Sequence, residues 1–112
     1  MSSTYRAAIC TELVGPNSIR LDDREAKLLK AGEVRIAVKA AGLNFPDLLM
    51  TYGKYQFRPD PPFIPGLEVA GEIIEVADDV KAFSAGDRVM GGSKGNGFAE
   101  QIILPDTAVR PL

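Results

Sequence analysis

Glycine and proline punctuate this chain so often that long helices are excluded from most of it. The 112 residues include 11 glycines and 8 prolines. Short apolar runs between such residues are typical of strands, and seven are expected here, at residues 5–13, 19–21, 34–40, 69–76, 88–90, 98–104 and 108–110. Many short strands with this punctuation predict a mainly β fold, a small and partly open β-barrel with one or two short helices.

Residues 34–40 alternate apolar and polar side chains, which predicts a strand with one buried face.

Two segments that contain glycine carry further expectations. Gly71 interrupts the strand at 69–76 and indicates a bulge or a close backbone approach. The glycine-rich stretch 91–97 matches neither G-x-G-x-x-G nor a Walker A sequence. It leads into a strand, so a hairpin loop is the expected structure rather than a phosphate-binding loop.

A single helix is predicted just before the proline-rich stretch that ends at Pro65. Asn44 is a candidate N-cap, and Pro46 fits the first turn, where its missing N–H costs nothing. Asp47 is expected to serve the same end of the helix. Gly53 ends the helix about two turns later.

Composition excludes several kinds of chemistry. The chain has no histidine and one cysteine, Cys10, so catalytic histidines are ruled out within it and a zinc site is not expected. Its net charge of −2 is spread along the sequence, which gives no basic surface for nucleic acid or anionic membranes. No signal core or membrane-spanning segment is visible. A cytoplasmic location is therefore the expectation.

Three short motifs give the chain a family resemblance. They are Gly-Leu-Asn-Phe-Pro-Asp at 42–47, Pro-Gly-Leu-Glu-Val-Ala-Gly at 65–71 and Ala-Gly-Asp-Arg-Val at 85–89. In this order they resemble the first domain of the medium-chain dehydrogenase/reductase superfamily, in its zinc-free NADPH:quinone oxidoreductase branch, which includes zeta-crystallin. The resemblance covers essentially the whole chain. The resemblance implies a GroES-like domain, and this implication does not depend on the strand pattern.

The resemblance also implies a chemistry, which is hydride transfer from NADPH to a quinone or to an activated alkene or carbonyl. Asn44 and Leu67 occupy positions that hold cysteine and histidine zinc ligands in the alcohol dehydrogenase branch, so no zinc is expected. The matching asparagine in quinone oxidoreductases is associated with the nicotinamide end of NADPH, which makes Asn44 the candidate cofactor-binding residue. Tyr55 matches a tyrosine at the active-site mouth and is the candidate catalytic hydrogen-bond donor. Leu49 departs from the tyrosine that some members carry.

A cofactor domain of this superfamily contains a Rossmann unit with a glycine-rich turn between strand and helix. The chain has no such sequence. Residues 1–112 are therefore expected to be the substrate-side domain of a longer reductase, with NADP(H) bound mainly by a domain outside this chain. Relatives dimerise through that domain, so a homodimer is expected for the intact protein. The 112-residue chain alone is predicted to be inactive.

Other interpretations remain open from the sequence. The chain could be a stand-alone GroES-like binding module, similar to a co-chaperonin, or part of a crystallin-like protein without turnover. At the level of single residues, Asn44 could serve only as a helix cap. Tyr55 could be an ordinary amphipathic residue between surface and core.

Overall fold

The computed structural model describes residues 4–112. The fold of this part of the chain is mainly β, with one short α-helix, α1 (Phe45–Thr51), and two single-turn 3-10 helices, η1 (Pro16–Ser18) and η2 (Asp106–Ala108). The strands are β1 (Thr4–Cys10), β2 (Ile19–Glu25), β3 (Glu33–Ala41), β4 (Glu68–Val76), β5 (Arg88–Gly92), β6 (Gln101–Pro105) and β7 (Val109–Pro111). No helix within residues 4–112 has the length and apolar character needed to cross a membrane.

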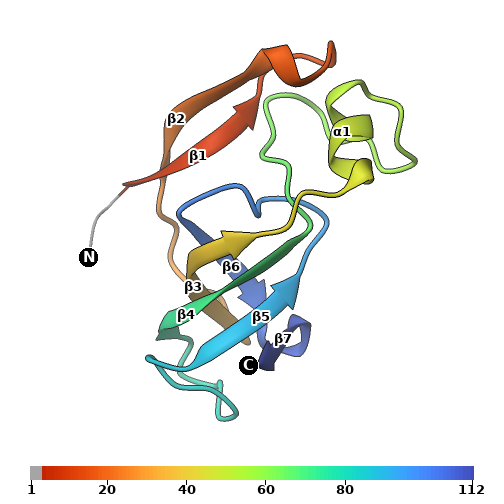
Figure 1. Ribbon diagram of the computed structural model, residues 1–112. Coiled ribbons are helices and arrows are strands. Elements are labelled where there is room, and N and C mark those ends of the chain that lie inside the picture. Colours follow the sequence, from red (N-terminus) through yellow and green to blue (C-terminus); the bar gives the residue numbers. More distant parts are fainter. Residues whose placement is uncertain (1–3) are drawn as a thin grey trace.

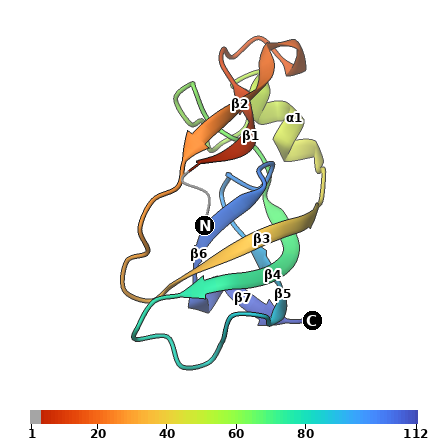
Figure 2. The same ribbon diagram turned by 90° about the vertical axis from the view of Figure 1, so that its left-hand side faces the viewer.

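Five strands form one antiparallel sheet in the order β6-β3-β4-β5-β7, and β1 pairs with β2 in a separate two-stranded sheet. The larger sheet curls at the lower end of the molecule, whereas the β1–β2 pair and α1 lie together at the upper end (Figure 1). Figure 2 shows the same division from the side, which matches an elongated shape of 41 × 26 × 22 Å. The prediction of a mainly β, partly open barrel is confirmed.

The main core lies within the curl of the five-stranded sheet. Its members are aliphatic and almost fully buried, and they come from every strand of that sheet and from the loop after β4: Val34, Ile36, Val69, Ile73, Val80, Val89, Ile102, Leu104 and Val109. A smaller apolar cluster of Ala7, Ile9 and Ile64 lies under β1. Burial of these side chains is the main source of stability for a domain of this size.

Gly71 lies where the backbones of β3 and β4 come closest. A Cβ at this position would collide with the carbonyl oxygen of Ala37. The register between the two strands shifts nearby, between Val38 and Ala40. The predicted close backbone approach at Gly71 is therefore confirmed, and the nearby bulge lies in β3.

Arg35 is a buried charge within an otherwise aliphatic strand segment. It is 2% exposed, although its neighbours Val34 and Ile36 fill the core on the opposite face of the sheet. Its guanidinium donates to Glu75 Oε1 at 2.9 Å, to Gln101 Oε1 at 2.8 Å and to the carbonyl oxygen of Lys27. The connection between β2 and β3 thus covers the face that alternation alone predicts to be solvent-exposed.

The glycine-rich stretch 91–97, which begins with the last two residues of β5, is not a hairpin loop, so that prediction is wrong. Strands β5 and β6 are not neighbours, because β4 and β3 lie between them in the sheet. The connection crosses toward β1 instead, and the Ala8 N–H donates to the Phe98 carbonyl oxygen at 2.8 Å. Residues 98–100 are used in this crossing, which is why β6 begins only at Gln101.

The β1–β2 hairpin also differs from its predicted bounds. Strand β1 ends at Cys10, and β2 runs on to Glu25 because each of its residues pairs with β1, as Arg24 does with Tyr5. The second half of β2 is polar on both faces, so it has no alternation that could have identified it as a strand.

Candidate active site

Helix α1 starts and ends where its sequence predicts. Asn44 is the N-cap, Pro46 lies in the first turn, and Asn44 and Asp47 form a capping box. The main-chain N–H of Asn44 donates to Asp47 Oδ2 at 2.9 Å. Gly53 takes a positive φ of 69° directly after the helix, a conformation that glycine adopts readily. Asn44 thus occupies the predicted N-cap position, and the Asp47 N–H donates to its main-chain oxygen at 3.0 Å.

Asp47 has a second contact that joins two distant motifs. Its Oδ1 accepts a hydrogen bond from the main-chain N–H of Gly66 at 3.1 Å, across 19 positions of sequence. The side chain is 2% exposed, so both carboxylate oxygens are buried and both are bonded to backbone N–H groups. Such charge-assisted hydrogen bonds are stronger than neutral ones. Asp47 therefore fixes the start of α1 against the segment that leads into β4.

Two glycines allow this segment to lie against the loop before β6. Gly66 has a φ of +112°, and a Cβ there would lie 2.6 Å from the Phe98 nitrogen. A Cβ at Gly97 would in turn lie 2.9 Å from the Gly66 carbonyl carbon. The Gly97 N–H donates to the Gly66 oxygen at 3.0 Å. The two backbones thus meet without side chains between them.

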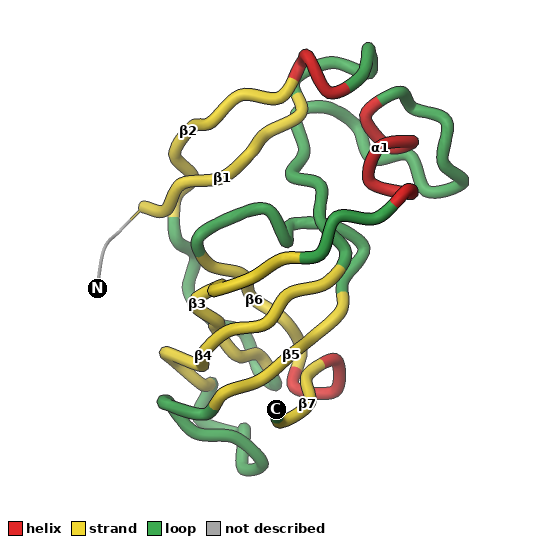
Figure 3. Tube along the Cα trace, viewed as in Figure 1, coloured by secondary structure: helices red, strands yellow, loops and turns green. Residues whose placement is uncertain are grey.

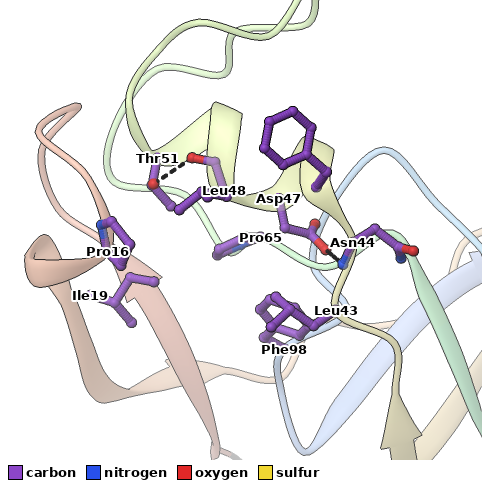
Figure 4. A pocket seen from close by; sticks show the side chains of 10 residues that line it. Pro16, Ile19, Leu43, Asn44, Asp47, Leu48, Thr51, Pro65 and Phe98 are labelled. Atoms are coloured by element: carbon purple, nitrogen blue, oxygen red, sulfur yellow. Dashed lines mark hydrogen bonds between the residues drawn. The ribbon is translucent and has the colours of Figure 1, made fainter.

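A pocket of about 560 Å³ opens between α1, the η1 turn and this crossing. Figure 4 shows side chains from all three regions around it, with the loop before β6 reaching it through Phe98. Its wall is mostly apolar and contains Pro16, Ile19, Leu43, Asn44, Phe45, Asp47, Leu48, Thr51, Pro65 and Phe98. The volume lies in the range of small-molecule sites.

The η1 turn is fixed to the helix beside this pocket. The Gly15 N–H donates to the Thr51 carbonyl oxygen at 2.9 Å. The Tyr52 ring lies so close to Gly15 that a Cβ there would be 2.6 Å from its Cε1 atom. Tyr52 therefore packs against the turn that leads into η1.

The structure places one of the two predicted site residues in the pocket wall. Asn44 lines the pocket. Tyr55 is half-buried and is not among the lining residues. It belongs to the long loop between α1 and β4, which Figure 3 shows. Leu67 is half-buried and also lies outside the wall, where its carbonyl oxygen accepts from the Ser93 N–H at 2.9 Å.

Sequence reasoning missed the apolar rim of the pocket. Leu43 is 78% exposed, Phe45 68% and Leu48 39%, and all three line it. Large apolar side chains are seldom left this exposed in a group without a ligand or partner. Two of these residues, Leu43 and Phe45, flank Asn44 in the sequence. Because Asn44 was the predicted cofactor-binding residue, this proximity could have indicated that they line the same site.

Several known proteins are similar to this chain in sequence and in fold. The profile of the alcohol dehydrogenase GroES-like domain matches residues 30–112. The quinone oxidoreductase-like protein 2 homolog of Nematostella vectensis is 44% identical over 107 residues, which are 95% of this chain and 29% of that protein. The chain therefore spans less than a third of that relative's length.

Two solved structures superpose on nearly the whole chain. The human synaptic vesicle membrane protein VAT-1 homolog-like protein has a TM-score of 0.94 at 35% identity, over 99% of this chain and 35% of its own. The quinone oxidoreductase of Thermus thermophilus, also solved in complex with NADPH, has a TM-score of 0.80 at 36% identity, over 96% of this chain and 32% of its own. The chain belongs to the alcohol dehydrogenase GroES-like domain family of the medium-chain dehydrogenase/reductases and is similar to their quinone oxidoreductases.

Proposed function

We propose that this chain is the substrate-side domain of an NADPH-dependent oxidoreductase that reduces quinones, or activated alkenes or carbonyls, without zinc. The observation that carries the proposal is the pocket at α1, whose mostly apolar wall includes Asn44. The likeness to a quinone oxidoreductase solved with NADPH supports it. Cofactor binding would rest mainly on a domain outside residues 1–112.

The pocket wall suits the nicotinamide end of the cofactor. A carboxamide both donates and accepts hydrogen bonds, and Asn44 lies between the apolar side chains of Leu43 and Phe45. NADPH, when bound, supplies the hydride. In this proposal Asn44 binds and orients the nicotinamide, and the surrounding apolar side chains exclude water from the reacting groups.

The residues at the two zinc-ligand positions of the alcohol dehydrogenase branch do not fit a zinc ion. Asn44 offers a carboxamide, and Leu67 has no donor atom in its side chain. Zinc sites in proteins use cysteine, histidine and carboxylate ligands. We therefore derive no step through a metal, and charge on the reduced oxygen would be stabilised by hydrogen bonds.

Tyr55 is the proposed donor of such a hydrogen bond. Its phenol lies in the loop after α1, outside the pocket wall, so the proposal requires this loop to approach the substrate in the intact protein. Replacing Tyr55 with phenylalanine removes only the hydroxyl. We expect kcat to fall and the KM for NADPH to stay unchanged, because NADPH is assigned to other residues.

Turnover by the intact protein tests the proposed function. Oxidation of NADPH with 1,2-naphthoquinone, followed by the loss of nicotinamide absorbance, is the expected result. The 112-residue chain on its own is expected to show none. Failure of the intact protein to oxidise NADPH with any quinone or enone would contradict the proposal, as would a full rate from the short chain.

The cap and cofactor roles of Asn44 can be separated by one substitution. Serine is as good an N-cap as asparagine, so Asn44→Ser preserves the start of α1 while removing the carboxamide. We expect the KM for NADPH to rise by up to about tenfold, the value of one hydrogen bond, with an unchanged melting temperature. A lower melting temperature with an unchanged KM would leave Asn44 as a cap only.

The intact protein is further proposed to be a cytoplasmic homodimer. Native mass spectrometry of the protein isolated from its source cells tests this assembly. A dimer of chains longer by a cofactor domain is expected. A ring of 112-residue chains would instead favour the co-chaperonin-like binding module.

A further inference from the structure

Two polar side chains in the pocket wall, those of Asp47 and Thr51, are bonded to the protein itself. The proposed function assigns the carboxamide of Asn44 to a ligand. Both oxygens of Asp47 accept backbone N–H groups, from Asn44 and from Gly66. The Thr51 hydroxyl donates to the Leu48 carbonyl oxygen at 2.7 Å, and this bond is drawn in Figure 4. Among the described residues that line the pocket, Asp47 is the one that is charged, and its charge is negative.

The entrance to the pocket is apolar as well. Leu43 and Phe45 flank Asn44 in the sequence, line the pocket and are 78% and 68% exposed. A ligand in this pocket therefore loses water against these two side chains. An apolar ring gains from this contact, whereas an anion would lose its hydration without meeting a cation in the wall.

We propose, on the basis of the proposed function, that this pocket selects uncharged quinones and discriminates against quinones with an anionic substituent, and that Leu43 and Phe45 determine this specificity. Within residues 4–112, the wall has no arginine or lysine to pair with a sulfonate or carboxylate. The one charged side chain that these residues place in the wall is that of Asp47, and its negative charge repels an anion. The pocket volume of about 560 Å³ is sufficient for a two-ring quinone.

The reaction itself places no requirement for charge on the ring substituents. A quinone takes one hydride from NADPH and one proton from water to give the quinol and NADP⁺. A sulfonate on the ring takes no part in this transfer. It withdraws electrons and makes the ring easier to reduce, so a preference for the uncharged quinone has to arise from binding in the pocket.

A matched pair of substrates tests the discrimination. We expect the intact protein to reduce 1,2-naphthoquinone with a kcat/KM at least about tenfold higher than that for 1,2-naphthoquinone-4-sulfonate. Calorimetric titration of both quinones without NADPH is expected to show a higher affinity for 1,2-naphthoquinone than for 1,2-naphthoquinone-4-sulfonate. Equal values for the two quinones, or a preference for the sulfonate, would overturn the inference.

Substitutions at the rim test the residues. Leu43→Arg and Phe45→Arg each place a guanidinium at the pocket entrance, and both positions are exposed enough to accept it. Each substitution is expected to lower the ratio of kcat/KM for 1,2-naphthoquinone to kcat/KM for the sulfonate by about tenfold. Leu28→Arg is the matched control, since Leu28 is 89% exposed and lies outside this pocket. It is expected to leave the preference within about twofold. A preference that changes equally in all three variants would contradict the assignment.

Failure of the inference and failure of the proposed function have different signatures. If both quinones are reduced with the same kcat/KM, the function stands and the specificity is wrong. If neither is reduced with NADPH but calorimetry shows binding of the uncharged quinone alone, the reductase function is wrong and the pocket specificity stands.

Discussion

Gly66→Ala is expected to destabilise the protein by about 3 kcal/mol or more. Two costs add at this position. The backbone has a φ of +112°, which costs an alanine about 1–3 kcal/mol. The new Cβ would also lie 2.6 Å from the Phe98 nitrogen and 2.8 Å from the Gly97 Cα, and overpacking of this kind costs about 1–3 kcal/mol. Because those neighbours are backbone atoms, neither can rotate away. Urea unfolding followed by circular dichroism measures the change.

Gly86→Ala is the matched control for that measurement. Gly86 has a similar φ of +98°, but no atom of the described chain lies within 4 Å of the position that a Cβ would take. Only the conformational cost applies there, about 1–3 kcal/mol. If both variants lost the same free energy of unfolding, the close contact between Gly66 and the loop before β6 would have no energetic weight.

Asp47→Asn is the second substitution with a large expected effect, about 3 kcal/mol of lost stability. The carboxylate accepts from the Asn44 N–H with one oxygen and from the Gly66 N–H with the other. Asparagine has one carbonyl oxygen, so its NH₂ group would face one of these donors. A buried N–H left without an acceptor costs about 1–3 kcal/mol, and a charge-assisted bond is lost as well.

Asp60→Asn provides the comparison, because Asp60 is exposed in the loop that follows α1. A surface change of this kind is expected to stay within about 0.5 kcal/mol. Thermal and urea unfolding of both variants, at the same pH and ionic strength, gives the difference. An Asp47→Asn protein as stable as Asp60→Asn would show that the bridge between the two motifs contributes nothing measurable.

Local signals in the sequence were sufficient to predict where most elements lie, but not the bounds of β1, β2 and β6 or the assembly of the sheet. The start of α1 follows from Asn44, Pro46 and Asp47, which act within one turn of chain, and the structure confirms it. The central strand at 34–40 follows from its alternation. The sheet order β6-β3-β4-β5-β7 depends on pairing between segments far apart in sequence, for which a single chain offers no local pattern.

The pocket was only partly predictable for the same reason. Asn44 could be identified because a motif surrounds it. Pro16 and Phe98 reach the same pocket from opposite ends of the sequence, and only the tertiary packing brings them together. Tyr55 lies in the loop between α1 and β4, and within residues 4–112 it does not reach the wall.

Arg35 affects the register in which the central strand β3 pairs with its neighbours during folding. Side chains of a strand alternate between faces, so a slip of β3 by one residue would turn every side chain to the opposite face. Arg35 would then enter the aliphatic core, and Val34 and Ile36 would lose their burial. In the native alignment Arg35 is opposite Glu75 of β4 and also reaches Gln101 of β6. One buried guanidinium thus makes the misaligned pairings of β3 with both neighbours costly, and so specifies a single native register.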